Sequence, residues 1–343
     1  MNVRGIFQCV FLGIGILFAG TLESQDLIYS QFNSMPLAIN PAFAGNNSCN
    51  YRVSAIRRWQ WLGVENAKSY NSLTVGGDFN LNNVYDEKYN IWGLGLTGSY
   101  DKSGLGSYTN MNLLASLAYH TRFGDGGKNF LSFALQTGIG QRGVDIGSFT
   151  FTDELDAYGR KPVGSTTGEV FQNDSKIYPE LGFGSMITLN PNDNTNMYFG
   201  ASIFHLLSPN ISFTNEEYKL PIRTNFHAGG NFYKGGFFYL PSIYFQVQQM
   251  TNYNIGTYFG TILAAGNEVK NPVIGYVGLW YKSSDAITPA LRLDIGRMTL
   301  AFSYDIHVGG VSQNLSGIGS PELSINYYGC FGRSSKRTGC PSL

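Results

Sequence analysis

From about residue 50 onward, apolar and polar residues alternate along segments of roughly ten residues, which are separated by Gly, Asn, Asp and Pro. Residues 129–142 show the pattern well. Their apolar and polar faces consist, respectively, of Leu131, Phe133, Leu135 and Ile139, and of Ser132, Ala134, Gln136 and Arg142. A period of two is typical of strands and not of helices. Because one face suits lipid and the other suits water, the pattern predicts an all-β fold, a transmembrane antiparallel β-barrel.

The whole chain, interpreted in this way, predicts about fourteen strands. They are expected at residues 51–60, 69–79, 90–100, 108–121, 129–142, 178–189, 196–205, 223–233, 240–249, 254–264, 273–281, 288–296, 299–307 and 322–329. An even number is typical of single-chain bacterial barrels. If the first strand starts in the periplasm, the long connections 143–177, 206–222 and 308–321 are extracellular, an asymmetry typical of outer-membrane barrels.

Composition supports a membrane barrel over a soluble β-sandwich. Charged residues make up only 13% of the chain, too few for polar faces that meet bulk water, and aromatic residues reach 15%. Aromatic residues near the expected strand ends, such as Trp59, Trp92, Trp280 and Tyr281, predict girdles at the two membrane interfaces. The net charge of zero gives nucleic-acid binding no electrostatic basis.

The sequence divides into four parts. Residues 1–24 carry Arg4 and a short apolar run and are interpreted as a signal peptide, which implies export to the outer membrane. Residues 25–50 form a short N-terminal periplasmic segment, rich in turns, which is expected at the periplasmic mouth of the barrel or just inside it. The barrel itself takes residues 51–331, and a short basic tail takes residues 332–343.

The chemistry of an enzyme is not evident in the sequence. The four histidines have no accompanying nucleophile motif, and no cofactor is expected. His205 and His227, with Glu216 and Glu217 between them, could form a metal site, but structural histidines are the preferred interpretation. Several charges are expected to face the lumen and to pair with one another rather than to line a conduit. They are Arg142, Arg292, Asp294, Arg297, Asp305 and His307.

Several blocks of sequence resemble the PorP/SprF family of type IX secretion system membrane proteins. The blocks are Tyr29-Ser30-Gln31-Phe32, Asn40-Pro41-Ala42-Phe43-Ala44-Gly45, Tyr51-Arg52 with Arg58-Trp59-Gln60-Trp61, the stretch with His205, Pro209, Phe213 and His227, the closing blocks Ser303-Tyr304-Asp305 and Ser320-Pro321-Glu322-Leu323-Ser324, and the tail Cys340-Pro341. Leu62 departs from the family pattern, which usually has Pro at that place. Together the blocks span almost the whole mature chain.

The resemblance implies a non-enzymatic outer-membrane component of type IX secretion and gliding in bacteria of the Bacteroidetes type. Such a protein binds, guides or anchors a secreted surface protein, an adhesin-like cargo, whose C-terminal domain it accompanies. Periplasmic components linked to peptidoglycan are further implied partners, beside the outer-membrane lipid. The alternative is a solute channel or transporter of the fatty-acid-porin kind. That class carries a longer N-terminal plug and an apolar internal pathway, whereas the internal faces here read as polar.

One disulfide is expected at the seam of the barrel. Closure places the last strand beside the first, which brings Cys330 to Cys49, and the tail also brings Cys340 within reach. We expect Cys49 to pair with Cys340 or Cys330, and Cys340 is preferred because it lies in the family-like tail.

The longest connection, 143–177, is the expected site of cargo docking. Loops of this length are usually functional or disordered, and aromatic anchors within a polar rim are typical of protein-binding surfaces. The docking residues are predicted to be Phe149, Phe151, Asp153, Glu154, Tyr158 and Phe171. The alternative is that this connection folds inward and plugs the lumen.

Overall fold

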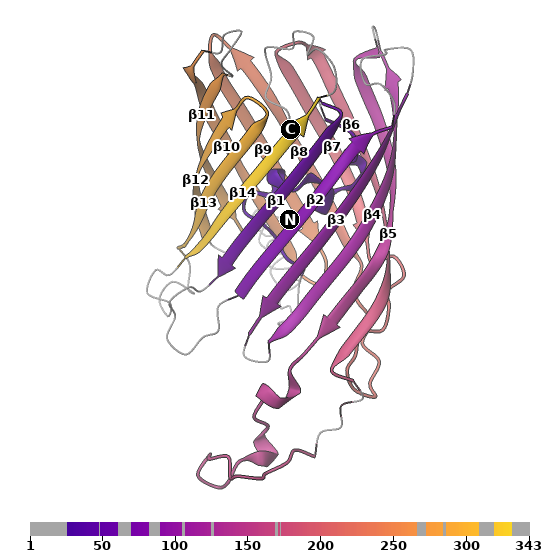
Figure 1. Ribbon diagram of the computed structural model, residues 1–343, viewed down its shortest axis with the longest axis vertical. Helices are drawn as coiled ribbons and strands as arrows, with labels where there is room; N and C mark the ends of the chain where they lie inside the picture. The colour runs from indigo at the N-terminus through magenta and orange to yellow at the C-terminus, as the bar shows by residue number, and fades with distance from the viewer. Residues whose placement is uncertain are drawn as a thin grey trace, which may run out of the picture.

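The computed structural model describes residues 26–47, 49–60, 70–81, 90–104, 107–124, 127–168, 171, 173–265, 272–283, 286–308 and 319–330. The signal peptide and the basic tail expected from the sequence lie outside these residues. Fourteen antiparallel strands close into a barrel, in which β1 pairs with β14 (Figure 1). The strands are β1 (Tyr51–Gln60), β2 (Tyr70–Asn80), β3 (Ile91–Ser103), β4 (Tyr108–Phe123), β5 (Asn129–Gly143), β6 (Ser175–Asn192), β7 (Thr195–Phe204), β8 (Arg223–Lys234), β9 (Phe237–Val247), β10 (Thr251–Ala264), β11 (Val273–Lys282), β12 (Ala286–Ile295), β13 (Met298–His307) and β14 (Ser320–Gly329).

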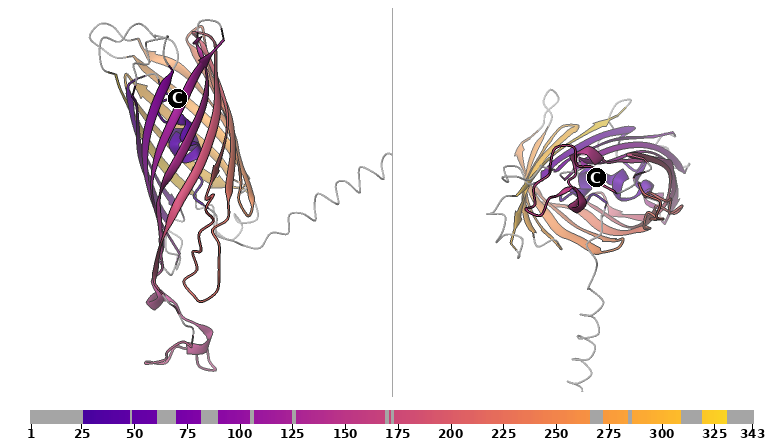
Figure 2. Two further views of the ribbon diagram at one scale, coloured as in Figure 1. Left: turned by 90° about the vertical axis from the view of Figure 1, so that its right-hand side faces the viewer. Right: turned by 90° about the horizontal axis from the view of Figure 1, so that it is seen from below.

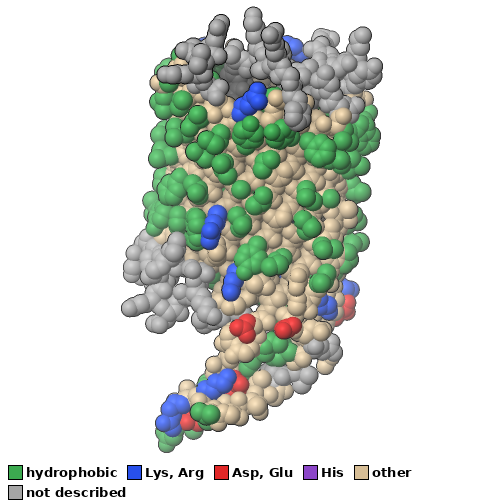
Figure 3. All heavy atoms as spheres, viewed as in Figure 1, with side chains coloured by type: hydrophobic (Ala, Val, Ile, Leu, Met, Phe, Trp, Pro, Cys, Tyr) green, Lys and Arg blue, Asp and Glu red, His purple; other side chains and the backbone are tan. Residues whose placement is uncertain are grey.

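The strand count and the fold class predicted from the sequence are confirmed, with strand ends shifted by a few residues. In β5 the side chains of Leu135 and Ile139 are more than half exposed, whereas Ser132 and Gln136 are buried inside. On the face seen in Figure 3, apolar side chains cover the wall of the barrel, and the acidic side chains in view lie toward the end that bears the β5–β6 connection. Period-two alternation therefore encodes an apolar outer face and a filled interior.

One predicted girdle residue is placed differently. Trp280 of β11 is buried inside the barrel, where its ring packs edge-on against Tyr258 at 4.3 Å. Its neighbour Tyr281 and Trp92 of β3 point outward and are exposed, as expected of girdle residues. The assignment of Trp280 was wrong because proximity to a strand end does not fix the face to which a side chain points.

We call the end of the barrel at which β1 begins the near end, and the opposite end the far end. At the near end Cys49 is joined to Cys330 by a disulfide that links the two sides of the β1–β14 seam. Cys330 is the partner that the sequence ranked second. Cys340, which was preferred, lies outside the described residues.

The segment before β1 lies inside the barrel. It contains the short helical turns η1 (Phe32–Ser34), α2 (Pro36–Ile39) and η2 (Pro41–Phe43). Proline suits these turns because it lacks the N–H that a central strand needs. Figure 2 shows the indigo segment within the ring of strands. In the described part of the chain no helix is long and apolar enough to cross a membrane.

The connection between β5 and β6 projects beyond the far end and does not enter the lumen (Figures 1 and 2). At its base the N–H of Val144 donates to the carbonyl of Asp174 at 2.8 Å. Two turns, η4 (Ile146–Ser148) and η5 (Thr152–Glu154), give it local structure. The inward-folding alternative considered from the sequence is therefore not the arrangement found.

Candidate functional site

The first candidate site is the lumen, which the N-terminal segment fills. We call residues 26–47 the plug. On one side the plug packs against an aromatic wall, where Phe32 stacks on Tyr244 with ring centroids 5.4 Å apart, and Ile39 joins the same buried cluster as Leu240 and Trp280. The internal faces are thus not uniformly polar, contrary to the expectation from the sequence. Aromatic residues at inward positions bury large apolar area against the plug.

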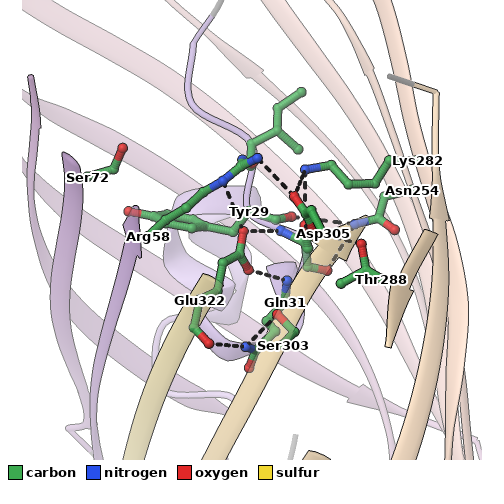
Figure 4. A network of polar contacts seen from close by, with 12 residues as sticks. Tyr29, Gln31, Arg58, Ser72, Asn254, Lys282, Thr288, Ser303, Asp305 and Glu322 are labelled. Atoms are coloured by element: carbon green, nitrogen blue, oxygen red, sulfur yellow. Dashed lines mark hydrogen bonds and ion pairs between the residues drawn. The ribbon is translucent and has the colours of Figure 1, made fainter. Parts of the chain in front are cut away.

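The centre of the polar side is Asp305 of β13, which is fully buried (Figure 4). Its carboxylate accepts hydrogen bonds from the hydroxyls of Ser30 at 2.5 Å and Thr288 at 2.6 Å. It also forms ion pairs with Arg58 of β1 at 2.9 Å and Lys282 of β11 at 3.2 Å. Two cations thus meet one carboxylate, so a second acid is needed to balance their charge.

Glu322 of β14 is that second acid (Figure 4). Its two carboxylate oxygens accept the backbone N–H groups of Ser30 at 2.8 Å and Gln31 at 2.9 Å, and Arg58 lies 3.4 Å away. The Gln31 side chain donates to the hydroxyl of Ser303 and accepts from that of Ser324, both at 2.8 Å. Buried charges are tolerated when they are paired and hydrogen-bonded in this way.

Asn40 fixes the middle of the plug. Its Nδ2 lies 3.0 Å from the carbonyl of Ser185, 3.1 Å from that of Ala201 and 2.9 Å from Nε2 of His227. The wall makes room by having glycine opposite, because a Cβ on Gly184 would lie 2.0 Å from Oδ1 of Asn40. The plug can therefore approach the wall more closely than it could if position 184 carried a side chain.

The near end of the plug is held by polar contacts to β2 and β4, and by Arg52 of β1, which donates to the carbonyl of Phe43 at 3.2 Å. The carboxylate of Asp78 accepts from the N–H of Gly45 at 2.9 Å and pairs with Arg52 at 2.8 Å. The carbonyl of Ala44 lies 2.8 Å from Nε2 of His120. Plug contacts thus continue from the central network down to the end that the disulfide closes.

The far end of the plug is fixed by Asp26. Its carboxylate lies 2.6 Å from Nε2 of His205 and 3.1 Å from Arg223, and Glu180 contacts the other ring nitrogen of His205 at 2.8 Å. Burial would raise the pKa of Asp26, but the charges of His205 and Arg223 outweigh burial and hold that pKa well below its usual range. Burial would lower the pKa of His205, but Asp26 and Glu180 raise it above its usual value.

The plug therefore runs through the lumen from the far end, at Asp26, to the near end, at Gly45. It reaches much further than the mouth at which the sequence placed this segment. The reason is chemical: the wall supplies charges and hydroxyls that satisfy the backbone and side chains of the segment along its whole length. A cavity between plug and wall, lined by Phe32 and Ile39 of the plug, measures about 40 Å³, which is room for a few water molecules.

The charges predicted to face the lumen are placed as follows. Asp305 and Arg142 contact the plug, and Arg292 pairs with Asp294 at 2.9 Å along the wall. Arg297 was assigned wrongly, because it lies exposed in the turn after β12. His307 is half-buried at the far end of β13.

The histidines do not form the conceivable metal site. His205 contacts carboxylates and His227 contacts Asn40, while Glu216 and Glu217 are exposed in the β7–β8 connection. Within the described residues, no group of three or more His, Cys, Asp or Glu side chains is arranged to hold a metal ion.

Most residues that carry the family resemblance meet around the plug. Gln31, Phe32, Asn40, Pro41 and Gly45 belong to it, and Arg58, His205 and His227 bind it. Three others lie elsewhere: Trp59 under the guanidinium of Arg57, Pro209 in a backbone bond to Leu220, and Phe213 edge-on to Tyr108.

Sequence reasoning missed several residues that fix the plug. They are Asp26 of the plug itself and, on the wall, Asp78, His120, Arg223, Lys282 and Glu322. Glu322 could have been found, because it is an acid at an inward position of a predicted strand. Asp26 lies outside any periodic segment and gave no such signal.

The second candidate site is the β5–β6 connection, which we call the arm (residues 144–174). Phe149, Phe151 and Phe171 form a row of half-buried rings with centroids 5.9 and 5.7 Å apart. The predicted docking acids mainly stabilise the arm itself. Asp153 accepts from the N–H of Gly168 at 2.6 Å, and Glu154 pairs with Lys161 at 2.8 Å.

The tip of the arm is where apolar groups remain exposed. The side chain of Tyr158 is 83% exposed and Val163 is fully exposed, and Arg160 lies over the ring of Tyr158 at 5.1 Å. A pair between Arg160 and Asp156 at 3.0 Å braces the turn that carries Tyr158. The arm thus presents a tyrosine, an aliphatic side chain and an arginine on a locally folded support, and tyrosine and arginine are enriched at protein interfaces.

Several solved barrels are similar in structure. A Pseudomonas aeruginosa FadL homologue aligns with 84% of this chain and 91% of its own, at 9% identity and a TM-score of 0.44. A mutant of the TodX monoaromatic hydrocarbon channel aligns with 85% of this chain and 92% of its own, at 12% identity and a TM-score of 0.41. CdiB from Acinetobacter baumannii aligns with 81% of this chain at 10% identity and a TM-score of 0.39, and this chain spans 59% of that chain. At these scores the similarities carry no argument about function.

Sequence comparison identifies the family. The search among curated protein sequences found no match. The family described as type IX secretion system membrane protein PorP/SprF matches residues 21–327, which is most of the chain. The resemblance seen in the sequence is thereby confirmed, and the chain belongs to the PorP/SprF family of type IX secretion system membrane proteins.

Proposed function

We propose that the protein is a non-enzymatic holder for a secreted surface protein, which it binds with the arm at the outside of the outer membrane. The observation that carries this proposal is the arm itself, a folded projection whose tip exposes Tyr158 and Val163. Exposed aromatic anchors on an internally braced loop favour binding of a protein over mere connection of two strands. In this arrangement the far end is extracellular, the near end is periplasmic, and residues 1–24 and 332–343 are a signal peptide and a short basic tail.

Fatty-acid-porin channels are also expected to carry a plug, so what supports a holder here is how closely the plug fits the lumen. Plug contacts extend from Asp26 to Gly45, and the cavity at the middle of the plug, beside Phe32 and Ile39, measures about 40 Å³. Small-molecule sites usually measure about 300–1,000 Å³. Passage of a solute through the lumen would need the plug to move, which would break the hydrogen bonds of Ser30 to Asp305 and Glu322 and the ion pairs of Asp26 at the far end.

The test replaces residues 150–172 by a Gly/Ser turn. The backbone hydrogen bond between Val144 and Asp174 lies outside the replaced residues and is kept. The barrel is therefore expected to assemble normally, as judged by heat-modifiable gel migration. The cell should lose the cargo from its surface. A finer variant, Tyr158→Ala with Val163→Ser, should act in the same direction, whereas Thr166→Ala on the same exposed arm should not. Full retention of cargo by the shortened protein would refute the docking role.

A further inference from the structure

The outer face of the barrel has a groove of about 330 Å³ near its far end. It is lined by the outward side chains of five neighbouring strands, β2 to β6. Its apolar lining residues are Leu73, Val75, Met111, Leu113, Ile139 and Ile177, each of which is exposed. The volume lies in the range of small-ligand sites. Bare barrel walls are convex, so a hollow of this size needs a cause.

The cause is Gly98 in the middle of β3. Strand register places Gly98 directly between Val75 of β2 and Leu113 of β4 on the same outward row. With hydrogen in place of a side chain, this position leaves a hollow between larger neighbours. A Cβ built on Gly98 would find its nearest heavy atom, the carbonyl oxygen of Asn112, 4.0 Å away. A larger side chain would therefore fit at this position without a clash with the backbone.

Polar and cationic residues close the far-end side of the groove. The next outward row toward the far end runs from Trp59 through Asn71 and Lys102 to Thr109. Lys102 is exposed on β3, and Arg57 on β1 is the neighbour of the groove residue Leu73. The guanidinium of Arg57 donates to Asn71 at 3.3 Å and lies over Trp59 at 4.7 Å. The groove thus has an apolar floor and, at one end only, two cations with amide and hydroxyl groups.

We propose that this groove binds one acyl chain of a phosphorylated glycolipid of the outer leaflet, with the lipid phosphate at Lys102 and Arg57. Acyl chains fill an apolar hollow that faces the bilayer, and cations with hydroxyl and amide groups suit a phosphate on a sugar. Assignment to the outer leaflet rests on the orientation in the proposed function, which makes the far end extracellular. A phospholipid headgroup offers the phosphate but not the sugar for the row of Asn71 and Thr109.

The experiment measures lipid binding to the purified, delipidated full-length protein in detergent by native mass spectrometry. The probes are bisphosphorylated lipid A, the same lipid A without phosphate, and phosphatidylglycerol. Wild type should bind bisphosphorylated lipid A best. Gly98→Leu, which fills the hollow, should weaken binding at least about tenfold, or about 1.4 kcal/mol. Lys102→Gln with Arg57→Gln should remove the preference for the phosphorylated probe.

Gly77→Leu is the matched control. Gly77 also faces outward on β2, between Val53 and Leu96, and its Cβ would have ordinary contact with the carbonyl of Arg52 at 3.5 Å. Binding should be unchanged in this variant, and heat-modifiable migration verifies folding of all variants. Equal binding of lipid A by wild type and Gly98→Leu would overturn the proposal, as would equal binding of phosphatidylglycerol. Because no cargo is present, failure here leaves the docking role of the arm untouched, and the reverse also holds.

Discussion

Substitution of Asp305 by asparagine is expected to loosen the plug. The carboxylate is fully buried and is shared by Ser30, Thr288, Arg58 and Lys282 at 2.5 to 3.2 Å. Asparagine keeps the shape but removes the charge, so two buried cations then face Glu322 alone. The plug loses the hydrogen bond of Ser30 to a charged carboxylate, which contributes about 1.5–3 kcal/mol. If the plug opens locally, amide hydrogen exchange in residues 26–47 should accelerate by about one to two orders of magnitude.

The measurement is hydrogen exchange by mass spectrometry on plug peptides, with peptides of β4 and β5 as internal references. The matched control is Asp294→Asn, because Asp294 is also a lumen acid but is bonded to Arg292 at 2.9 Å and Thr299 at 2.7 Å, both in the wall. It should leave plug exchange near the wild-type rate. Wild-type exchange in the Asp305→Asn plug would show that this carboxylate does not hold the plug.

Three further predictions follow from the same contacts. Cys49→Ser should destabilise the closed barrel by about 2–4 kcal/mol, seen as heat-modified migration at lower temperature, and reductant should then have no further effect on this variant. Deletion of residues 26–47 should convert a non-conducting barrel into a conducting one in planar bilayers; a silent plug-less barrel would contradict occlusion by the plug. The contact of Asp26 with His205 should depend on pH with opposite signs for the two groups. Because the pKa of His205 is raised, the stability that its protonation contributes is complete below about pH 6.5 and is lost as the pH rises through the raised pKa. Because the pKa of Asp26 is lowered, the stability that its ionised form contributes is kept down to about pH 4. Protection factors of the first plug peptide should therefore fall on the alkaline side, and His205→Gln should abolish that dependence.

The strands of the barrel wall could be predicted from the sequence because each strand has one face toward lipid and one toward the interior. Lipid selects apolar side chains at every second position, as Leu135 and Ile139 of β5 show, and the interior selects small or polar ones such as Ser132. This signal is local and repeats fourteen times, so a shift at one strand end leaves the count unchanged. Trp280 shows the limit: an aromatic side chain fits both faces, and only the register decides.

The content of the lumen was not readable in the same way. The plug has no periodic pattern of apolar and polar residues, because each of its residues contacts a different part of the wall. Asn40 matches a gap opposite Gly184, and Ser30 matches an acid on β13 that lies 275 residues away in the chain. Inward charges could be recognised on single strands, but their partners are set by three-dimensional closure. The pairing of Arg142 with Asp26 at 3.8 Å is an example.

Closure of the barrel and binding of the plug are physically coupled. Arg58 on the first strand donates to the carbonyl of Ile28 at 2.5 Å, and Glu322 on the last strand accepts from the N–H groups of Ser30 and Gln31. The plug is thus bonded to both sides of the β1–β14 seam. The disulfide joins the same seam at the near end. Opening the seam would therefore break plug contacts as well as ladder bonds, and releasing the plug would leave buried charges along the seam. For this reason the plug acts as an internal brace of the wall.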